Sequence, residues 1–183
     1  MSDAARGARF EALFREVYEP LQWYARRRTD ATTADDVVAE ALTVLWRRLD
    51  EVPDGMALPW SYGVARRCLA NARRGDARRE QLTDRLVAER TGMSTNVDPA
   101  VDALDDAMGE LPSDDRELLH LWAWEGLAPR EIALVLGVSA NAVSIRLHRA
   151  KTELKKRLAG KDLPAAGHMR GGDTPTTRVE EAT

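Results

Sequence analysis

Apolar residues recur at intervals of three and four along most of the chain, which is the spacing of one face of an α-helix. The first 90 residues contain no alternation of the kind that a strand would show. These intervals predict helices over residues 9–28, 33–48, 60–79, 101–111, 113–125 and 127–158, the last range holding a pair. We therefore predict an all-α chain.

Two stretches lack this periodicity and divide the chain. Residues 81–99 contain the loop-like segment TGMSTNVDP, and residues 161–183 are rich in glycine, proline and threonine. We predict two small helical domains, 9–80 and 100–160, joined by a flexible linker over 81–99. The tail over 161–183 is predicted to be disordered.

Several helix ends carry signals in the sequence. Pro20 is expected to kink the first helix or to break it near Glu19, because proline lacks a backbone N–H. Thr33, with Asp36 three residues later, is expected to cap the second helix. Ser113 is expected to cap the helix that follows the short acidic one.

The range 127–158 has the pattern of a helix-turn-helix and reads LAPREIALVLGVSANAVSIRLHRAKTELKKRL. Pro129 suits the first position of a helix, where its missing N–H is not needed. Gly137 suits the turn out of that helix, and Ser139 suits the cap of the next one. The range therefore predicts two short helices joined by a tight turn.

The second helix of this pair has two different faces. An apolar stripe is predicted to point inward, at Val143, Leu147, Ala150, Leu154 and Leu158. The outward face carries side chains able to contact base edges and phosphates in a major groove, at Asn141, Ser144, Ile145, Arg146, His148, Arg149 and Lys151. The alternative is an ordinary helical hairpin with a solvated basic face.

The predicted helix over 60–79 carries the densest positive charge in the chain, at Arg66, Arg67, Arg73, Arg74, Arg78 and Arg79. Two aromatic residues, Trp60 and Tyr62, stand at its start. Arginines that hold phosphates and rings that stack bases are typical of proteins that bind single-stranded nucleic acid. The structural alternative is that Trp60 lies in the core and the arginines keep the surface soluble.

Composition and charge narrow the class of protein. The chain has 183 residues, of which 27 are basic and 30 acidic, for a net charge of −3. The net charge does not indicate a nucleic-acid partner, but the local clustering of arginines does. A single cysteine, Cys68, excludes an internal disulfide and fits a reducing cytosol. No apolar run is long enough to cross a bilayer and no signal core is present, so we predict a cytoplasmic protein without membrane insertion.

An enzyme is disfavoured by the scatter of its reactive residues. His120, His148 and His168 do not have the spacing of metal ligands. Cys68 falls on an apolar helix face, where an inert thiol is expected. We predict no catalytic residue, no metal and no cofactor.

Three segments, taken in order, resemble a bacterial RNA polymerase sigma factor of the extracytoplasmic-function type over residues 10–158. The helix that such factors dock on the clamp helices of the polymerase β′ subunit is similar to DDVVAEALTVLWRRL. The segment that melts and recognises the −10 promoter element is similar to PWSYGVARRCLANARRG. The domain that recognises the −35 element is similar to ELPSDDRELLHLWAWEGLAPREIALVLGVSANAVSIRLHRAK.

The resemblance implies partners and residue roles. The partners would be core RNA polymerase, through its β′ clamp helices and β flap, promoter DNA, and an anti-sigma factor. Polymerase contacts would fall on Asp36, Ala39 and Glu40. Contacts to the −10 element would fall on Trp60, Tyr62, Arg66, Arg67, Asn71, Arg73 and Arg74. Contacts to the −35 element would fall on the outward face of the second helix of the 127–158 pair. The alternative function is that of a stand-alone helix-turn-helix regulator.

Overall fold

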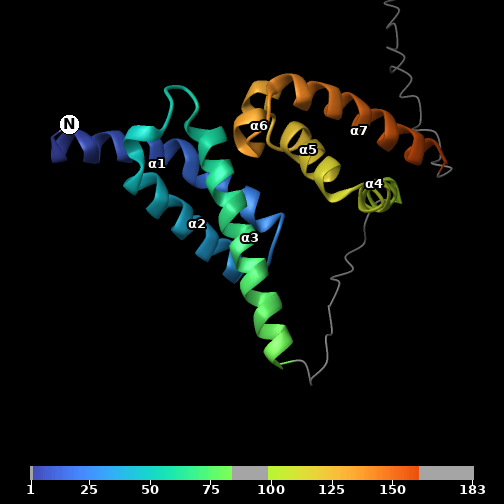
Figure 1. Cartoon of the computed structure of the whole chain (residues 1–183), viewed down its shortest axis with the longest axis horizontal. Helices are drawn as coiled ribbons and strands as arrows, with labels where there is room; N and C mark the ends of the chain where they lie inside the picture. The colour runs from blue at the N-terminus through green and yellow to red at the C-terminus, as the bar shows by residue number, and fades with distance from the viewer. Residues whose placement is uncertain (1, 84–98, 161–183) are drawn as a thin grey trace, which may run out of the picture.

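The computed structural model describes residues 2–83 and 99–160, and the side chains within 2–75 and 103–160 (Figure 1). Within these ranges all regular structure is helical, which confirms the predicted all-α fold. The elements are α1 (Asp3–Arg26), α2 (Ala31–Arg47), the short 3-10 helix η1 (Leu49–Glu51), α3 (Ala57–Thr83), α4 (Pro99–Gly109), α5 (Ser113–Ala123), α6 (Pro129–Leu136) and α7 (Ala140–Gly160). Most of the predicted linker and the whole predicted tail lie outside the described residues.

The first three helices pack against one another as a bundle, which Figure 1 shows in blue to green. Each contributes the apolar face that its periodicity predicts. The buried side chains of this bundle include Val17, Leu21, Val38, Leu45 and Leu69. No single helix in the described part of the chain is long and apolar enough to cross a membrane.

The first two helices start earlier than predicted, because other side chains cap them. Ser2 Oγ accepts a hydrogen bond from the backbone N–H of Ala5, so α1 begins at Asp3 and not at Arg9. Asp30 Oδ1 accepts from the N–H of Thr33 at 3.0 Å and caps α2. The predicted Thr33 cap is therefore wrong, since Thr33 is the donor in the cap that Asp30 makes.

Proline does not divide α1, which continues through Pro20 to Arg26. The predicted break near Glu19 is wrong. Val17 and Leu21, on either side of the proline, are buried in the same core, and this packing stabilises the helix across Pro20. The predicted Ser113 cap is also wrong: Pro112 occupies the cap position of α5, and no side chain caps that helix.

The predicted helix-turn-helix is present as α6 and α7, whose axes are bent by 104°. Pro129 is the first residue of α6, and Gly137 ends it with a φ of 70°, which a side chain would make costly. Ser139 Oγ accepts from the N–H of Ala142 at 3.2 Å and caps α7, as predicted. Glu131 Oε2 accepts from the N–H of Ala128 at 2.7 Å and fixes the start of α6.

The two halves of the chain pack on each other, because α6 lies against α3 (Figure 1). The two backbones come close at Gly63 of α3, where an added Cβ would lie 3.5 Å from both Cα and the carbonyl oxygen of Val135. Buried residues of both halves form a single apolar cluster. This junction brings the arginine-rich helix next to the helix-turn-helix.

Candidate nucleic-acid interface

The outward face of α7 is open to solvent. Its inward stripe supplies Val143, Leu147 and Ala150 to the core, which turns the remaining positions outward. The exposed members of the predicted −35 set are Asn141, Ser144, Ile145, His148 and Arg149. The Ser144 hydroxyl donates to the carbonyl of Ala140 at 3.0 Å, so it is engaged within its own helix.

Two cations of the predicted −35 set already have partners within the protein. The Arg146 guanidinium lies 3.5 Å from Asp115 Oδ1 and 3.7 Å from Asp114 Oδ2, both on α5. Lys151 Nζ lies 3.3 Å from the ring centroid of Trp122, a cation–π contact across the same helix pair. These two residues tie α7 to α5, whereas Arg149 has no such contact among the described residues.

The aromatic residues of the predicted −10 set are not exposed in the same way. Tyr62 is only 2% exposed, and its ring lies 4.8 Å from that of Tyr24. Burial raises the pKa of Tyr62, and the nearby carboxylate of Glu125 raises it further. Trp60 is half-buried, with the guanidinium of Arg48 5.9 Å from its ring centroid.

The polar side chains of the predicted −10 set lie on the exposed side of α3, at Arg66, Arg67, Asn71, Arg73 and Arg74. Arg73 Nη2 donates to the carbonyl oxygen of Arg28 at 3.1 Å, and Arg74 donates to the side chain of Asn71. The side chains of Arg78 and Arg79 lie outside the described residues. The described arginines form a basic strip along α3 that ends at the junction with the second half.

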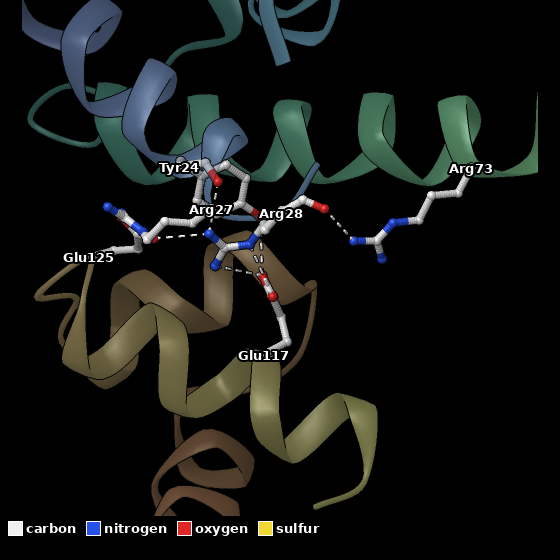
Figure 2. A network of polar contacts seen from close by, with 6 residues as sticks. All are labelled: Tyr24, Arg27, Arg28, Arg73, Glu117 and Glu125. Atoms are coloured by element: carbon white, nitrogen blue, oxygen red, sulfur yellow. Dashed lines mark hydrogen bonds and ion pairs between the residues drawn. The ribbon is translucent and has the colours of Figure 1, made fainter. Parts of the chain in front are cut away.

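A network of ion pairs, which sequence reasoning missed, crosses that junction (Figure 2). Arg28 Nη1 lies 3.1 Å from Glu125 Oε1 and its Nε lies 3.3 Å from Glu117 Oε2. Arg27 Nη2 donates to Glu125 Oε2 at 2.6 Å, and the Tyr24 hydroxyl donates to Glu117 Oε1 at 3.1 Å. We call these five residues the junction network.

The junction network is largely removed from water. The side chains of Arg28 and Glu125 are 6% and 2% exposed. Burial by itself lowers the pKa of Arg28, but the effects of Tyr24 and of the Glu117 carboxylate are larger together and raise it. The guanidinium of Arg28 therefore stays charged. The guanidinium also stacks 3.7 Å from the ring centroid of Tyr24. These ion pairs could not be predicted from the sequence, because Arg28 is separated from Glu117 and Glu125 by 89 or more positions.

The junction also encloses a cleft of about 240 Å³ beside the basic strip. Arg66 and Arg73 of α3 line one side of it, and Asp114 and Glu117 of α5 line the other. Carboxylates of the second half therefore lie opposite arginines of the first.

The predicted polymerase-binding residues Asp36, Ala39 and Glu40 are all exposed on α2. Ala39 borders a groove of about 550 Å³ between α1 and α2, together with Tyr18 and Trp23 of α1. These two aromatic side chains are 41% and 57% exposed, and sequence reasoning did not single them out. Tyr18 directly follows the buried Val17 in the sequence. That its side chain is exposed follows from the packing of the bundle and not from helical spacing.

No reactive centre is apparent among these residues. Cys68 is buried and free, and burial raises the pKa of its thiol to about 11, with Glu40 adding to the shift. Within the described ranges, no three side chains of His, Cys, Asp or Glu are grouped so as to hold a metal ion. The arrangement suits binding and not catalysis, because a helix-turn-helix with an open polar face lies on one bundle and a basic strip lies on the other.

Comparison with known proteins identifies the family. The family Sigma-70, region 4 matches residues 102–154, which include the helix-turn-helix. The ECF RNA polymerase sigma factor SigL of Mycobacterium tuberculosis is 32% identical over 162 residues, covering 85% of this chain and 92% of SigL. The RNA polymerase sigma factor CarQ of Myxococcus xanthus is 32% identical over 174 residues, covering 90% of this chain and 97% of CarQ. This chain therefore belongs to the extracytoplasmic-function (ECF) family of RNA polymerase sigma factors.

Solved structures show the same fold. The sigma factor RpoE of Bartonella quintana, in complex with the anti-sigma factor NepR, superposes with a TM-score of 0.62 at 21% identity, covering 82% of this chain and 96% of RpoE. CnrH, in complex with the cytosolic domain of CnrY, gives 0.55 at 24% identity, covering 84% and 89%. The function predicted from the sequence, an alternative sigma factor and not a stand-alone regulator, is confirmed by the family.

Proposed function

We propose that this sigma factor recognises its promoter with two separate surfaces. The exposed face of α7 would contact the −35 duplex, with Arg149 as its principal side chain for base edges. The basic strip of α3, with Tyr62 and Trp60 at its start, would hold the opened −10 strand. The observation that supports this division is that each surface lies on a different helical bundle, so the two can contact DNA sites that are apart.

The proposed domain division follows the predicted one. A region 2-like domain would occupy residues 9–80 and a region 4-like domain residues 100–160. The predicted tail over 161–183 and most of the predicted linker over 81–99 lie outside the described residues. Capture of two independently folded fragments by limited proteolysis would support this division, and a single protected fragment would contradict it.

Core RNA polymerase would bind the exposed face of α2. Asp36 and Glu40 are exposed acids on one side of that helix, and the aromatic groove borders Ala39. An acidic rim beside apolar side chains suits a basic partner surface with an apolar centre. The β flap of the polymerase would bind the second half.

Because sigma factors assist the polymerase and transform no substrate themselves, we also propose that the chain has no catalytic activity and acts in the cytoplasm.

A third partner is proposed from the structural likeness to RpoE, whose solved structure contains the anti-sigma factor NepR. We infer that this chain too is held inactive by an anti-sigma protein. Affinity capture of the tagged chain from cells, under growth conditions with and without stress, tests this. Recovery of core polymerase alone under every condition would contradict it.

Run-off transcription tests the function directly. Purified chain and core polymerase would be incubated with genomic fragments, and we expect discrete transcripts that core polymerase alone does not make. The variant Asp36→Asn with Glu40→Gln is expected to reduce transcripts and polymerase capture together. The matched control is Glu11→Gln with Glu51→Gln, which removes two exposed carboxylates elsewhere. Equal loss in both would contradict the assignment of α2.

A further inference from the structure

Ile145 is a large apolar side chain at the centre of a polar surface that faces solvent. It lies in the second turn of α7 and is 47% exposed. Helical spacing places Asn141 on one side of it and His148 and Arg149 on the other, and all three are exposed. The outward face of α7 therefore presents one apolar point enclosed by polar side chains.

Neither helix propensity nor core packing accounts for an isoleucine at this position. A β-branched side chain loses rotamer freedom in a helix, so the isoleucine does not favour the helical backbone. The apolar cluster of the described residues takes Val143, Leu147 and Leu154 from α7, and Ile145 is not part of it. Isolated exposed apolar residues are common on proteins, so it is the setting of Ile145 that points to a ligand.

The two polar residues beside Ile145 in the sequence are engaged within the protein. The Ser144 hydroxyl donates to the carbonyl oxygen of Ala140 at 3.0 Å. The Arg146 guanidinium lies 3.5 Å from Asp115 Oδ1 on α5. Their hydrogen-bonding groups thus have partners already, whereas the Ile145 side chain projects into solvent.

The major groove offers an isoleucine a single kind of partner among the base edges. Adenine, guanine and cytosine present hydrogen-bond donors and acceptors there, and thymine adds an apolar group, its C5 methyl. Isoleucine makes no hydrogen bond, so over a donor or acceptor it would displace water without replacing the hydrogen bond that is lost. It gains from contact only at a thymine methyl group.

We propose that Ile145 makes this sigma factor select a thymine in the −35 element of its promoters, through contact between its side chain and the thymine C5 methyl group. Arg149, one helical turn further along α7, then contacts a guanine of the same element, because a guanidinium binds guanine O6 and N7 together. This inference rests on the proposed function of α7. The ligand that it specifies is a duplex with a T·A pair near a G·C pair.

Replacement of single thymines by deoxyuridine tests the contact, because deoxyuridine lacks only the methyl group and still pairs with adenine. The promoter is the one that run-off transcription identifies, and the holoenzyme is titrated with duplexes in which each −35 thymine, on either strand, is replaced in turn. We expect one replacement to weaken binding about fourfold, the effect of one buried methyl group. Replacement of a thymine between the −35 and −10 elements is the control and should leave the affinity unchanged.

The variant Ile145→Ala completes a double-mutant cycle with this replacement. Alanine is the better helix former at an exposed helical position, so the fold is kept, and circular dichroism verifies this. We expect the variant to bind the thymine and deoxyuridine duplexes equally well. The control Leu134→Ala shortens an exposed apolar residue of α6 and should keep the difference that the wild type shows.

Each other outcome decides against a specific claim. A −35 element with no thymine on either strand overturns the inference while the proposed function stands, and so does an element in which no replacement weakens binding. A difference of the same size in the wild type and in Ile145→Ala also overturns it, since the methyl group then contacts another residue. A chain that starts no transcripts with core polymerase contradicts the proposed function instead, and the inference falls with it.

Discussion

The exposed face of α7 and the basic strip of α3 make an instructive comparison, since both are proposed to bind DNA and both belong to one chain. On α7 the side chains of Asn141, Ser144, His148 and Arg149 are all exposed. On α3 the arginines are exposed but Tyr62, which precedes them, is buried with its ring against that of Tyr24. A surface is thus available or blocked according to what the rest of the chain lays against it, and not according to its own residues.

Helix α6 connects the two helices that carry these surfaces, because it packs on both α7 and α3. Its residues Ile132 and Val135 are buried, and the backbone of Val135 faces Gly63 of α3. A movement of α6 away from α3 would therefore carry α7 with it, so the two proposed contact surfaces are linked through α6.

The largest expected effect comes from Arg28→Ala, which breaks the junction between the two regions. It would leave Glu117 without its cation and the buried carboxylate of Glu125 with Arg27 alone, so we expect the free energy of unfolding to fall by about 3–5 kcal/mol. Urea unfolding followed by tryptophan fluorescence measures this. The control Arg48→Ala removes a solvent-exposed partner of Glu51 and should leave the curve where it is. Coincident curves for all three proteins would contradict a stabilising junction.

The next effect concerns the open surface. Arg149→Ala removes an exposed cation of α7 and should weaken promoter binding by the holoenzyme about tenfold or more, since a base contact of this kind contributes about 1–3 kcal/mol. The unfolding curve should not change, because the side chain makes no described contact within the protein. Arg15→Ala on α1 is the control for lost positive charge. The assignment fails if the two variants bind promoter fragments equally well.

Alkaline pH sharpens the comparison for the covered surface. Burial raises the pKa of both Tyr24 and Tyr62 above the ordinary 10.0. Because the folded-state pKa values exceed the unfolded ones, their contribution to stability is complete below about pH 10 and is lost as the pH rises further. We expect the melting temperature to fall between about pH 9 and pH 11.

Tyr62→Phe provides the matching control for this pH series. It removes one of the two ionisable hydroxyls, so its melting temperature should fall less steeply over the same range. Wild type and variant with the same slope would show that Tyr62 is not held in its neutral form by the junction.

The smallest expected effect concerns Lys151, which belongs to the open helix but already has a partner. Its ammonium lies on the ring of Trp122, so Lys151→Met should leave the salt dependence of promoter binding almost unchanged. Arg149→Ala, in contrast, should reduce that dependence by about one phosphate contact. Holoenzyme affinities measured over a series of salt concentrations decide this, and an equal reduction for both variants would place Lys151 on the DNA.

Local signals predicted much of the fold. Pro129, Gly137 and Ser139 act where the sequence indicated, because capping and turn geometry depend on immediate neighbours. Where the prediction was wrong, packing or a competing neighbour decided the outcome. Asp30 took the cap expected at Thr33, and the burial of Val17 and Leu21 kept α1 whole through Pro20.

The helices, the inward stripe of α7 and the clusters of charge could be predicted from the pattern of residues, since each depends on neighbours three or four positions apart. Which of those charges have partners within the protein depends on how the helices pack. Arg28 pairs with Glu117 and Glu125 across about 90 positions, Arg146 pairs with Asp115 of α5, and Tyr62 of α3 packs on Tyr24 of α1. Such pairings arise when separate helices pack, and helical periodicity carries no information about which face of one helix will meet which face of another.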